Sequence, residues 1–388
     1  MRNFSSQHWL SQLMVIIRLF NGTLRAHFDP MFCRRIRGLF LLVLMLASAE
    51  ARAGLVIIPT FDSTITSDPN AAVIENTINW AIQVYQARFS DPITVKITFK
   101  EMSSGLGMSQ WQYYSINYSQ FRSKLGTDAS TTNDNIALTQ LTSTTVNPVD
   151  GSSKINVKTA NLRALGITGL NPTMPGGVDG IVSLNTSIMN LTRPGGNPGK
   201  YDLMAVAEHE IDEVLGLASA LDFGSGVLPE DLFRYDASGN RNFTTNGDTA
   251  YFSLDGTKLL ARFNQNSGGD FGDWWTAGSH SPQVQDAFAT SGATPNLNSE
   301  LVALDAIGYS LLPPPTPAIQ NVAVTAGAVH LTWSALAGLS YQVQYTTNPV
   351  STNWNNLGSP IVATNITASA SDSVGASARR FYRILSLP

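Results

Sequence analysis

The hydrophobic positions between residues 55 and 99 repeat with the periods of a strand, a helix and a second strand. Residues 55–61, LVIIPTF, form a short apolar run that is typical of a buried strand. The spacing of apolar residues from Asn70 onward predicts a helix over 70–89 with one buried stripe: Ile74, Ile78, Ala81, Ile82, Tyr85 and Phe89. Apolar residues then alternate from Ile93 to Phe99, which predicts a strand buried on one face. This order indicates a twisted sheet with a backing helix.

The pattern is weaker over the next hundred residues. Ser, Gly, Thr and Asn are frequent in residues 103–150, which we interpret as mostly surface, with no residue that stands out as catalytic. Short helices are expected at 118–125, 133–141 and 158–165. Residues 179–185, DGIVSLN, predict a further strand, which a loop rich in Gly and Pro connects to the next helix.

Residues 201–220, YDLMAVAEHEIDEVLGLASA, predict the helix around which the rest of the chain is arranged. Asp202 is an acceptable N-cap residue, and residues 203–215 contain neither Gly nor Pro. Gly216 stands where a C-cap glycine is favoured. The helix is therefore expected to begin after Asp202 and to end near Gly216.

The C-terminal part of the chain has a different pattern. Residues 313–317, PPPTP, predict a stiff linker. Beyond it, apolar and aromatic residues alternate in short runs separated by turn residues, as in a β-sandwich: Val322/Val324, Val329/Leu331/Trp333, Tyr341/Val343/Tyr345 and Tyr382/Ile384. We therefore expect an all-β domain over residues 318–388.

Composition indicates a secreted protein. Only 13% of the residues are charged, and residues 31–53 have the form of a signal peptide. This segment has a basic start, an apolar run over 39–47 that is too short for a stable membrane anchor, and the small-residue site Ala51-Arg52-Ala53. We expect residues 1–53 to be a leader, with Met31 as the true start, and no membrane insertion after its removal.

Charge and residue counts restrict what the mature chain can do. Without residues 1–53 it has 17 basic and 26 acidic residues, a net charge of −9, which argues against nucleic acid and anionic membranes as partners. The one cysteine, Cys33, lies in the leader, so disulfides and thiol chemistry are excluded. Three histidines remain, and His330 belongs to a predicted strand of the C-terminal domain: His209, His280 and His330. A metal site would therefore be built largely from oxygen ligands.

The helix over residues 201–220 carries the candidate chemistry. Positions four apart share one face of a helix, so His209 and Glu213 are expected to point the same way. An imidazole and a carboxylate one turn apart form half of a metal site. Glu210, beside His209, could act as a general base on metal-bound water. The simpler interpretation is an acidic amphipathic helix that happens to contain a histidine.

HEIDEVLG, residues 209–216, resembles the zincin helix HExxHxxG, with Glu213 in place of the second histidine. Downstream, DLFRYD, YFSLDG, GDW and LDAIGY occur in the order of similar blocks in secreted bacterial metalloproteases distantly similar to leishmanolysin. In those blocks Asp273 takes the position of the third histidine ligand, and Asp270 and His280 are its rivals. The metzincin ligand position at Ser219 and the methionine turn are not matched.

The resemblance implies an α+β zincin-like domain over residues 54–312, followed by a sandwich like a fibronectin type III domain. It implies a peptidase that uses Zn²⁺ or another divalent cation held by His209, Glu213 and Asp273, and we expect this secreted protein to be a monomer. Glu210 would be the catalytic base, and a peptide or protein would be the substrate. The implied substrate-binding residues belong to the strand before the helix and to an aromatic pair: Gly180, Ile181, Val182, Ser183, Leu184 and Trp274.

Two other interpretations remain open. The chain could be a binding or adhesion protein that keeps a zincin shell without catalysis, because the second histidine and the methionine turn are missing. It could also hold a structural cation such as Ca²⁺, although His209 argues against this because Ca²⁺ prefers oxygen ligands.

Overall fold

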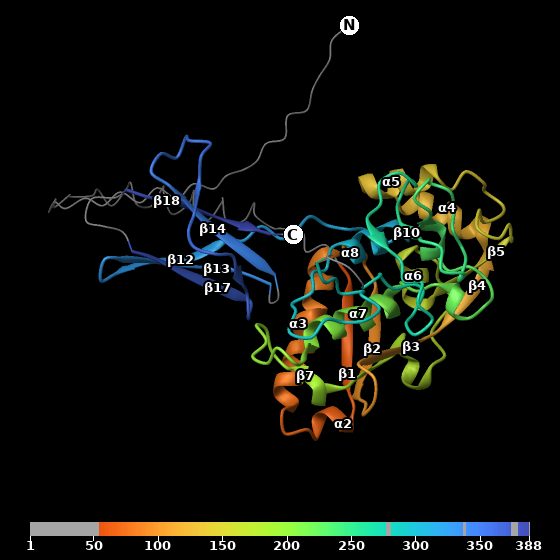
Figure 1. Cartoon of the computed structure of the whole chain (residues 1–388), viewed down its shortest axis with the longest axis horizontal. Coiled ribbons are helices and arrows are strands. Elements are labelled where there is room, and N and C mark those ends of the chain that lie inside the picture. The colour runs from red at the N-terminus through yellow and green to blue at the C-terminus, as the bar shows by residue number, and fades with distance from the viewer. Residues whose placement is uncertain (1–53, 277–280, 337–338, 374–378, 388) are drawn as a thin grey trace, which may run out of the picture.

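The computed structural model describes residues 54–276, 281–336, 339–373 and 379–387 (Figure 1). The predicted leader, residues 1–53, and His280 lie outside this part of the chain. Buried hydrophobic side chains form two separate clusters, one between Leu55 and Tyr309 and one between Leu331 and Ile384. The first cluster belongs to sheets and helices together, and the second belongs to strands. The fold class is therefore mixed α+β, as the hydrophobic pattern predicts.

A four-stranded sheet with the order β1-β2-β6-β3 forms the frame of the first part. The strands β1 (Val56–Phe61), β2 (Thr94–Glu101) and β6 (Gly180–Leu184) are parallel neighbours, and β3 (Gly107–Trp111) pairs antiparallel with β6. The alternating apolar residues of β2 are all fully buried: Val95, Ile97 and Phe99. The antiparallel strand β3 is thus an edge of this sheet.

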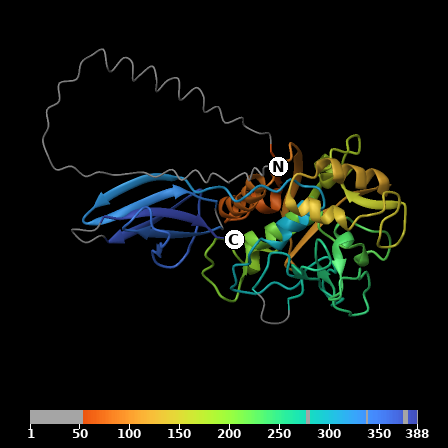
Figure 2. The ribbon, with the colours of Figure 1, turned by 90° about the horizontal axis from the view of Figure 1, so that it is seen from above.

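Two helices pack side by side on this frame. Helix α3 (Ala71–Arg88) buries the whole predicted stripe, and helix α7 (Leu203–Leu215) packs against α3, β3 and β6 (Figures 1 and 2). The predicted starting residue Asn70 stands at the N-cap of α3, but its side chain makes no capping hydrogen bond. The side chain of Asp202 does cap α7, because it accepts a hydrogen bond of 3.0 Å from the amide of Ala205.

Buried side chains fix the C-terminal end of α7. The Lys158 ammonium donates to the carbonyl oxygens of Glu213 at 2.6 Å and Leu217 at 2.8 Å. The Tyr309 hydroxyl donates to the carbonyl oxygen of Leu215 at 2.7 Å. The last carbonyls of a helix have no partner within the helix, and leaving buried ones unpaired is costly. These donors therefore hold the turn that carries Glu213 in one place.

The remaining elements of the first part are short. The helices are α2 (Ser63–Thr66), α4 (Tyr118–Asp128), α5 (Thr132–Thr139), α6 (Thr159–Ala164) and α8 (Ser299–Ala306), with 3₁₀ turns at Pro175–Gly177, Thr186–Ile188, Ala220–Asp222 and Glu230–Phe233. The strands pair as β4 (Tyr113–Asn117) with β5 (Lys154–Lys158), β7 (Met189–Asn190) with β8 (Tyr201–Asp202), and β9 (Arg234–Tyr235), β10 (Tyr251–Phe252) and β11 (Ala261–Arg262) in one small sheet. Most of residues 103–150 are exposed or half-buried, as expected, but they also contain β3 and β4, two strands that the sequence pattern did not predict.

The C-terminal strands form two small sheets around the second cluster. One sheet has the order β12 (Ile319–Thr325), β13 (Ala328–Ser334), β17 (Thr367–Ser373). In the other, β14 (Ser340–Thr346) pairs with β15 (Asn355–Asn356), β16 (Ile361–Val362) and β18 (Phe381–Ser386). Trp333 and Tyr341 pack in the centre with ring centroids 6.2 Å apart. Two sheets with a shared core are the arrangement that the alternating pattern predicts.

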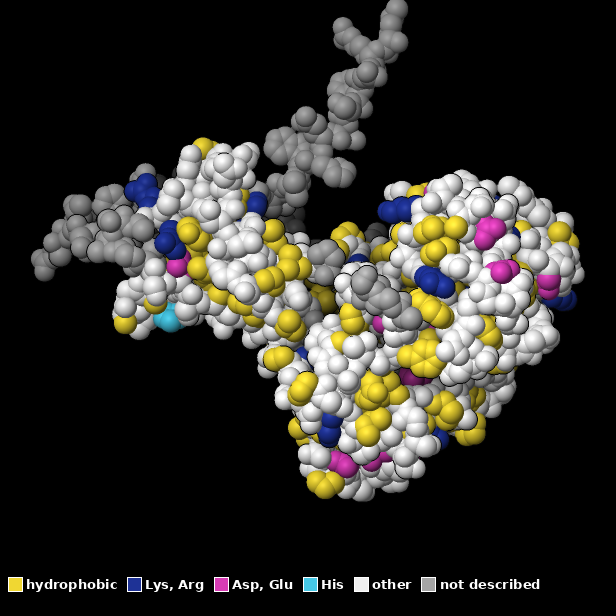
Figure 3. Space-filling model, viewed as in Figure 1, with side chains coloured by type: hydrophobic (Ala, Val, Ile, Leu, Met, Phe, Trp, Pro, Cys, Tyr) yellow, Lys and Arg dark blue, Asp and Glu magenta, His cyan; other side chains and the backbone are white. Residues whose placement is uncertain are grey.

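Charged side chains are sparse on the surface. On the face drawn in Figure 3, Lys and Arg side chains are scattered among uncharged ones and do not form a continuous basic surface. Among the described residues, no helix has the length and apolar character needed to cross a membrane.

Candidate metal centre

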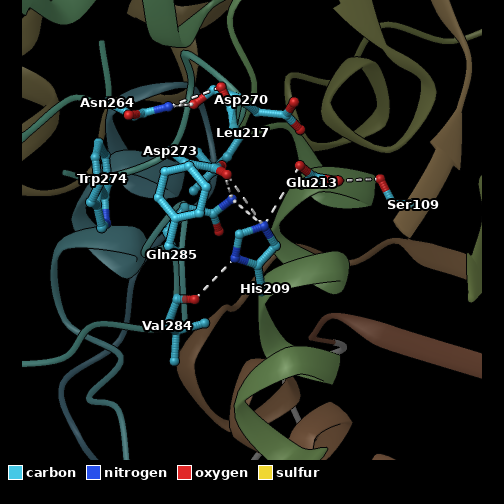
Figure 4. Close-up of polar contacts among 12 residues, drawn as sticks. Ser109, His209, Glu213, Leu217, Asn264, Asp270, Asp273, Trp274, Val284 and Gln285 are labelled. Carbon is cyan, nitrogen blue, oxygen red and sulfur yellow. Dashed lines mark hydrogen bonds and ion pairs between the residues drawn. The ribbon is translucent and has the colours of Figure 1, made fainter. Parts of the chain in front are cut away.

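The three predicted ligands lie together at the C-terminal half of α7. The Nε2 atom of His209 lies 3.8 Å from Oε1 of Glu213 and 3.7 Å from Oδ2 of Asp273 (Figure 4). The three ligand atoms all lie within 4.8 Å of one another. The side chains are 16%, 10% and 7% exposed, respectively, so the group is largely shielded from water but open to one side. A cation held by these three side chains would keep at least one coordination position for water or substrate.

A short segment of backbone positions Asp273 against the helix. The amide of Trp274 donates to the carbonyl of Gln285 at 2.8 Å, which pairs the two segments that approach His209. The Glu300 carboxylate, at the start of α8, accepts from the Trp274 indole and from the Gln285 amide, both at 3.0 Å. Because one buried carboxylate binds both segments, α8 fixes the position of Asp273 relative to α7.

Each of the three ligands also has a hydrogen-bond partner of its own. His209 Nδ1 lies 3.0 Å from the carbonyl oxygen of Val284, which fixes Nδ1 as the protonated nitrogen and leaves Nε2 for a cation. The side-chain amide of Gln285 donates to Oδ1 of Asp273 at 2.9 Å. The Ser109 hydroxyl, on β3, donates to Oε2 of Glu213 (Figure 4). Every ligand is therefore held in one orientation before a cation binds.

Glu210 lines the same pocket, which has a volume of about 240 Å³. The side chain is 4% exposed and lies against the backbone of β3 at Gly107. A Cβ atom at position 107 would clash with Oε1 of Glu210 and would lie 2.7 Å from Cγ1 of Val206. Gly107 is thus the reason that the Glu210 carboxyl fits between α7 and the edge strand.

Replacing Gly107 with Ala is expected to displace the Glu210 carboxyl and to lower any activity that depends on it by at least about tenfold, because small misplacements of a catalytic group reduce rates strongly. Metal content should not change, because the three atoms nearest to the added methyl group belong to Glu210 and Val206 and not to a ligand. The matched control is Gly196→Ala, where an added Cβ would have no neighbour within 4 Å. Equal kinetics in the two variants would show that the position of Glu210 does not depend on Gly107.

In the absence of a metal ion, the charge of the site is set by a protonated histidine among carboxylates. Burial by itself lowers the pKa of His209, but Asp273, Glu210 and Glu213 outweigh it and raise that pKa to about 10. Burial raises the pKa of Asp273, and the neighbouring imidazolium opposes this shift. Burial and the adjacent Glu213 raise the pKa of Glu210 well above its usual range. A doubly charged cation at the centre would replace the proton on His209, so its binding should release protons.

The residues present fit a divalent transition metal. A tetrahedral cation with bonds of about 2.0–2.2 Å holds its ligand atoms roughly 3.3–3.6 Å apart. This spacing is a few tenths of an ångström less than the two distances from His209 Nε2, and the Glu213 and Asp273 oxygens lie within 4.8 Å of each other. One imidazole and two carboxylates suit Zn²⁺ and other cations of intermediate hardness. The three side chains could close around such an ion with small rotations.

The structure brings His209, Glu213, Asp273 and Glu210 to one pocket. Of the two rivals for the third ligand, Asp270 is exposed, lines the pocket and is not part of the three-ligand group, and His280 lies outside the described residues.

Two parts of the predicted substrate site were wrong. The strand Gly180–Leu184 is not an edge, because it pairs with β2 on one side and β3 on the other, so its backbone cannot bind an extended peptide. Trp274 is fully buried, and its ring packs on Phe252 and Phe263. It belongs to the core and cannot line a cleft.

Three residues of the site were not predicted from the sequence: Gly107, Ser109 and Gln285. The first two lie on β3, in a stretch rich in Ser and Gly that has no clear strand alternation. Gln285 lies 12 positions from its partner Asp273 in a region without regular elements. The GLGMS sequence before Trp111 offered only a weak signal, a glycine in a short strand where another side chain approaches closely.

Comparison with known proteins gives no relative: no family model, curated protein or solved structure matches this chain.

Proposed function

We propose that this protein is a secreted metal-dependent peptidase with a zincin-like domain followed by a sandwich domain like fibronectin type III. The observation that carries the proposal is the three-ligand group, in which each ligand is separately held, beside a buried carboxyl in the same pocket. The resemblance of HEIDEVLG to the zincin helix supports it independently.

His209, Glu213 and Asp273 would hold the cation, which supplies a polarised carbonyl and a water of lowered pKa when it is bound. Glu210 would accept a proton from the attacking water and deliver it to the leaving amine. Its position one residue from His209 and its shielded setting suit both transfers. Lys158 and the Tyr309 hydroxyl would keep the end of α7 in place during the reaction.

An extended peptide would bind along β3. Among the strands of the described residues it pairs with β6 alone, and three of its residues line the pocket: Gly107, Met108 and Ser109. A free strand edge beside the catalytic group offers backbone hydrogen bonds to any peptide, and neighbouring pockets then select side chains. The substrate-binding role that the resemblance implied for β6 would thus fall to β3.

A non-catalytic binding protein with a zincin shell is the second candidate. One observation favours it: the charged imidazole of His209 between Glu213 and Asp273 satisfies the three side chains without any cation. In that case the site would be a structural ion-pair group, and substituting its members would change stability alone.

Metal content and hydrolysis distinguish the two candidates. We expect protein purified from the culture medium of cells expressing the full chain to contain about one zinc or similar ion per chain and to cleave members of a peptide library. A strong chelator should remove both the ion and the activity, and added metal should restore both. If the protein takes up no metal even when zinc is supplied, the binding protein is the better description.

A further inference from the structure

We infer that Ser109 and Gln285 are positioning residues that make both carboxylate ligands bind through a single oxygen, and so select a transition metal over Ca²⁺. This inference rests on the proposed metal centre and adds the reason for its selectivity. It concerns two side chains that do not belong to the HEIDEVLG helix or to Asp273 itself.

The two carboxylate ligands, Glu213 and Asp273, have the same pattern of contacts. Glu213 turns Oε1 toward His209, and its other oxygen, Oε2, accepts from the Ser109 hydroxyl. Asp273 turns Oδ2 toward His209, and its other oxygen, Oδ1, accepts from the Gln285 amide at 2.9 Å. In each case a neutral donor binds the carboxylate oxygen that is not the one nearest to His209 Nε2. One oxygen per carboxylate is therefore left for a cation.

The orientation of the Gln285 amide follows from its partner. If its oxygen pointed at Asp273, two oxygen atoms without a shared proton would lie 2.9 Å apart, which is repulsive. The nitrogen therefore faces Oδ1, and it also lies 3.4 Å from His209 Nε2. The backbone of the preceding residue, Val284, holds the other nitrogen of the same imidazole. Residues 284 and 285 thus orient two of the three ligands from one segment.

Rigid surroundings make these donors effective. Gln285 is 1% exposed, and its backbone amide is bound by Glu300 at 3.0 Å. Ser109 lies on β3 between Gly107 and Trp111, whose ring stacks on the ammonium of Lys158 at 3.6 Å from the ring centroid. The backbones of both donors are therefore held in place by their neighbours, so a carboxylate that rotates to offer both oxygens to a cation gives up its hydrogen bond.

The consequence is metal selectivity. Ca²⁺ takes six to eight oxygens and commonly binds carboxylates through both oxygens, whereas Zn²⁺ is satisfied by four ligands. A site limited to one nitrogen and two oxygens, with open positions for water, suits the second kind of ion. Partners that orient metal ligands in this way typically contribute about 10–100-fold to metal affinity.

The test compares Ser109→Ala, Gln285→Leu and the double variant with the natural protein. Matched controls are Ser115→Ala on β4 and Gln110→Leu on β3, two exposed positions. Dissociation constants for Zn²⁺ and Ca²⁺ are measured by competition with chelators, and the visible absorption of the Co²⁺ form reports coordination number. Far-ultraviolet circular dichroism in chelator identifies variants that do not fold, and Gln285→Asn then replaces Gln285→Leu.

We expect each single variant to bind Zn²⁺ about 10–100-fold more weakly and the double variant to lose more. The affinity for Ca²⁺ should fall less or rise, so that the dissociation constants for Ca²⁺ and Zn²⁺ become more similar. The Co²⁺ absorption should weaken as the freed carboxylates bind through both oxygens. Unchanged zinc affinity and Co²⁺ absorption in folded single variants would overturn the inference while leaving the proposed function intact. Absence of metal binding by the natural protein would overturn both.

Discussion

Replacing Glu210 with Gln is expected to lower kcat/KM for peptide hydrolysis by about 10²–10⁴-fold, the usual contribution of a general base. The amide has the shape of the carboxyl, so the fit against Gly107 is retained, but it cannot accept and return a proton. Glu210 is not one of the three ligand residues, and bound metal should therefore stay at its natural level. Initial rates on the best library peptide and elemental analysis of the same sample measure the two quantities.

The control for this variant is Glu75→Gln on α3, which removes one carboxylate outside the pocket. It should have natural activity, so that any general effect of the lost charge is subtracted. Activity within threefold of the natural protein in Glu210→Gln would show that another group takes the proton. Loss of metal together with activity would instead make Glu210 a ligand and leave the base unassigned.

The main helices and strands of the first part were predictable because each of them has a single, regular period of hydrophobic residues. Every residue of the 74–89 stripe is buried in α3, and the alternation of β2 gives its buried face directly. Helix α7 begins and ends where its caps predict, after Asp202 and before Gly216. These signals are local, because a residue's burial on a regular element follows from its neighbours in sequence.

The strand order of the sheet was not predictable in the same way. The sequence shows that residues 180–184 form a strand, but the partner on each side depends on contacts with distant segments. Here β3, which is 70 residues earlier, covers the edge that the resemblance assigned to substrate. Trp274 is a similar case, because its burial depends on Phe252, Phe263 and Glu300, which come from three other segments.

The residues of the candidate site fall into the same two groups: those that local patterns predict and those that depend on tertiary contacts. His209, Glu210 and Glu213 follow from helix periodicity, and Asp273 follows from the order of the downstream blocks. Ser109 and Gln285 contact the ligands only through tertiary structure, so a single sequence contains no pattern that identifies them. The residues proposed to select the ion are therefore harder to predict than the residues proposed to bind it.

Replacing His209 with Ala is expected to abolish stoichiometric metal binding and to destabilise the metal-free protein by about 3 kcal/mol near pH 7, the usual cost of removing one partner of a buried ion pair. In the metal-free protein the imidazolium lies between Glu213 and Asp273, and its loss leaves these buried carboxylates without a positive partner. Elemental analysis measures the first effect, and chemical unfolding in the presence of chelator measures the second.

The pH dependence of this loss of stability gives a sharper test. A pKa raised to about 10 in the folded protein, against roughly 6.5 in the unfolded chain, means that His209 stabilises the fold fully below about pH 6.5. That stabilisation is lost as pH rises through the folded pKa. The difference in the free energy of unfolding between the natural protein and His209→Ala should therefore be larger at pH 7 than at pH 10.

The control is His330→Ala, which replaces an exposed histidine of β13 and should change neither metal content nor the free energy of unfolding. A difference for His209→Ala that does not vary between pH 7 and 10 would mean that the imidazole is neutral, and that the three side chains are held by packing and not by charge.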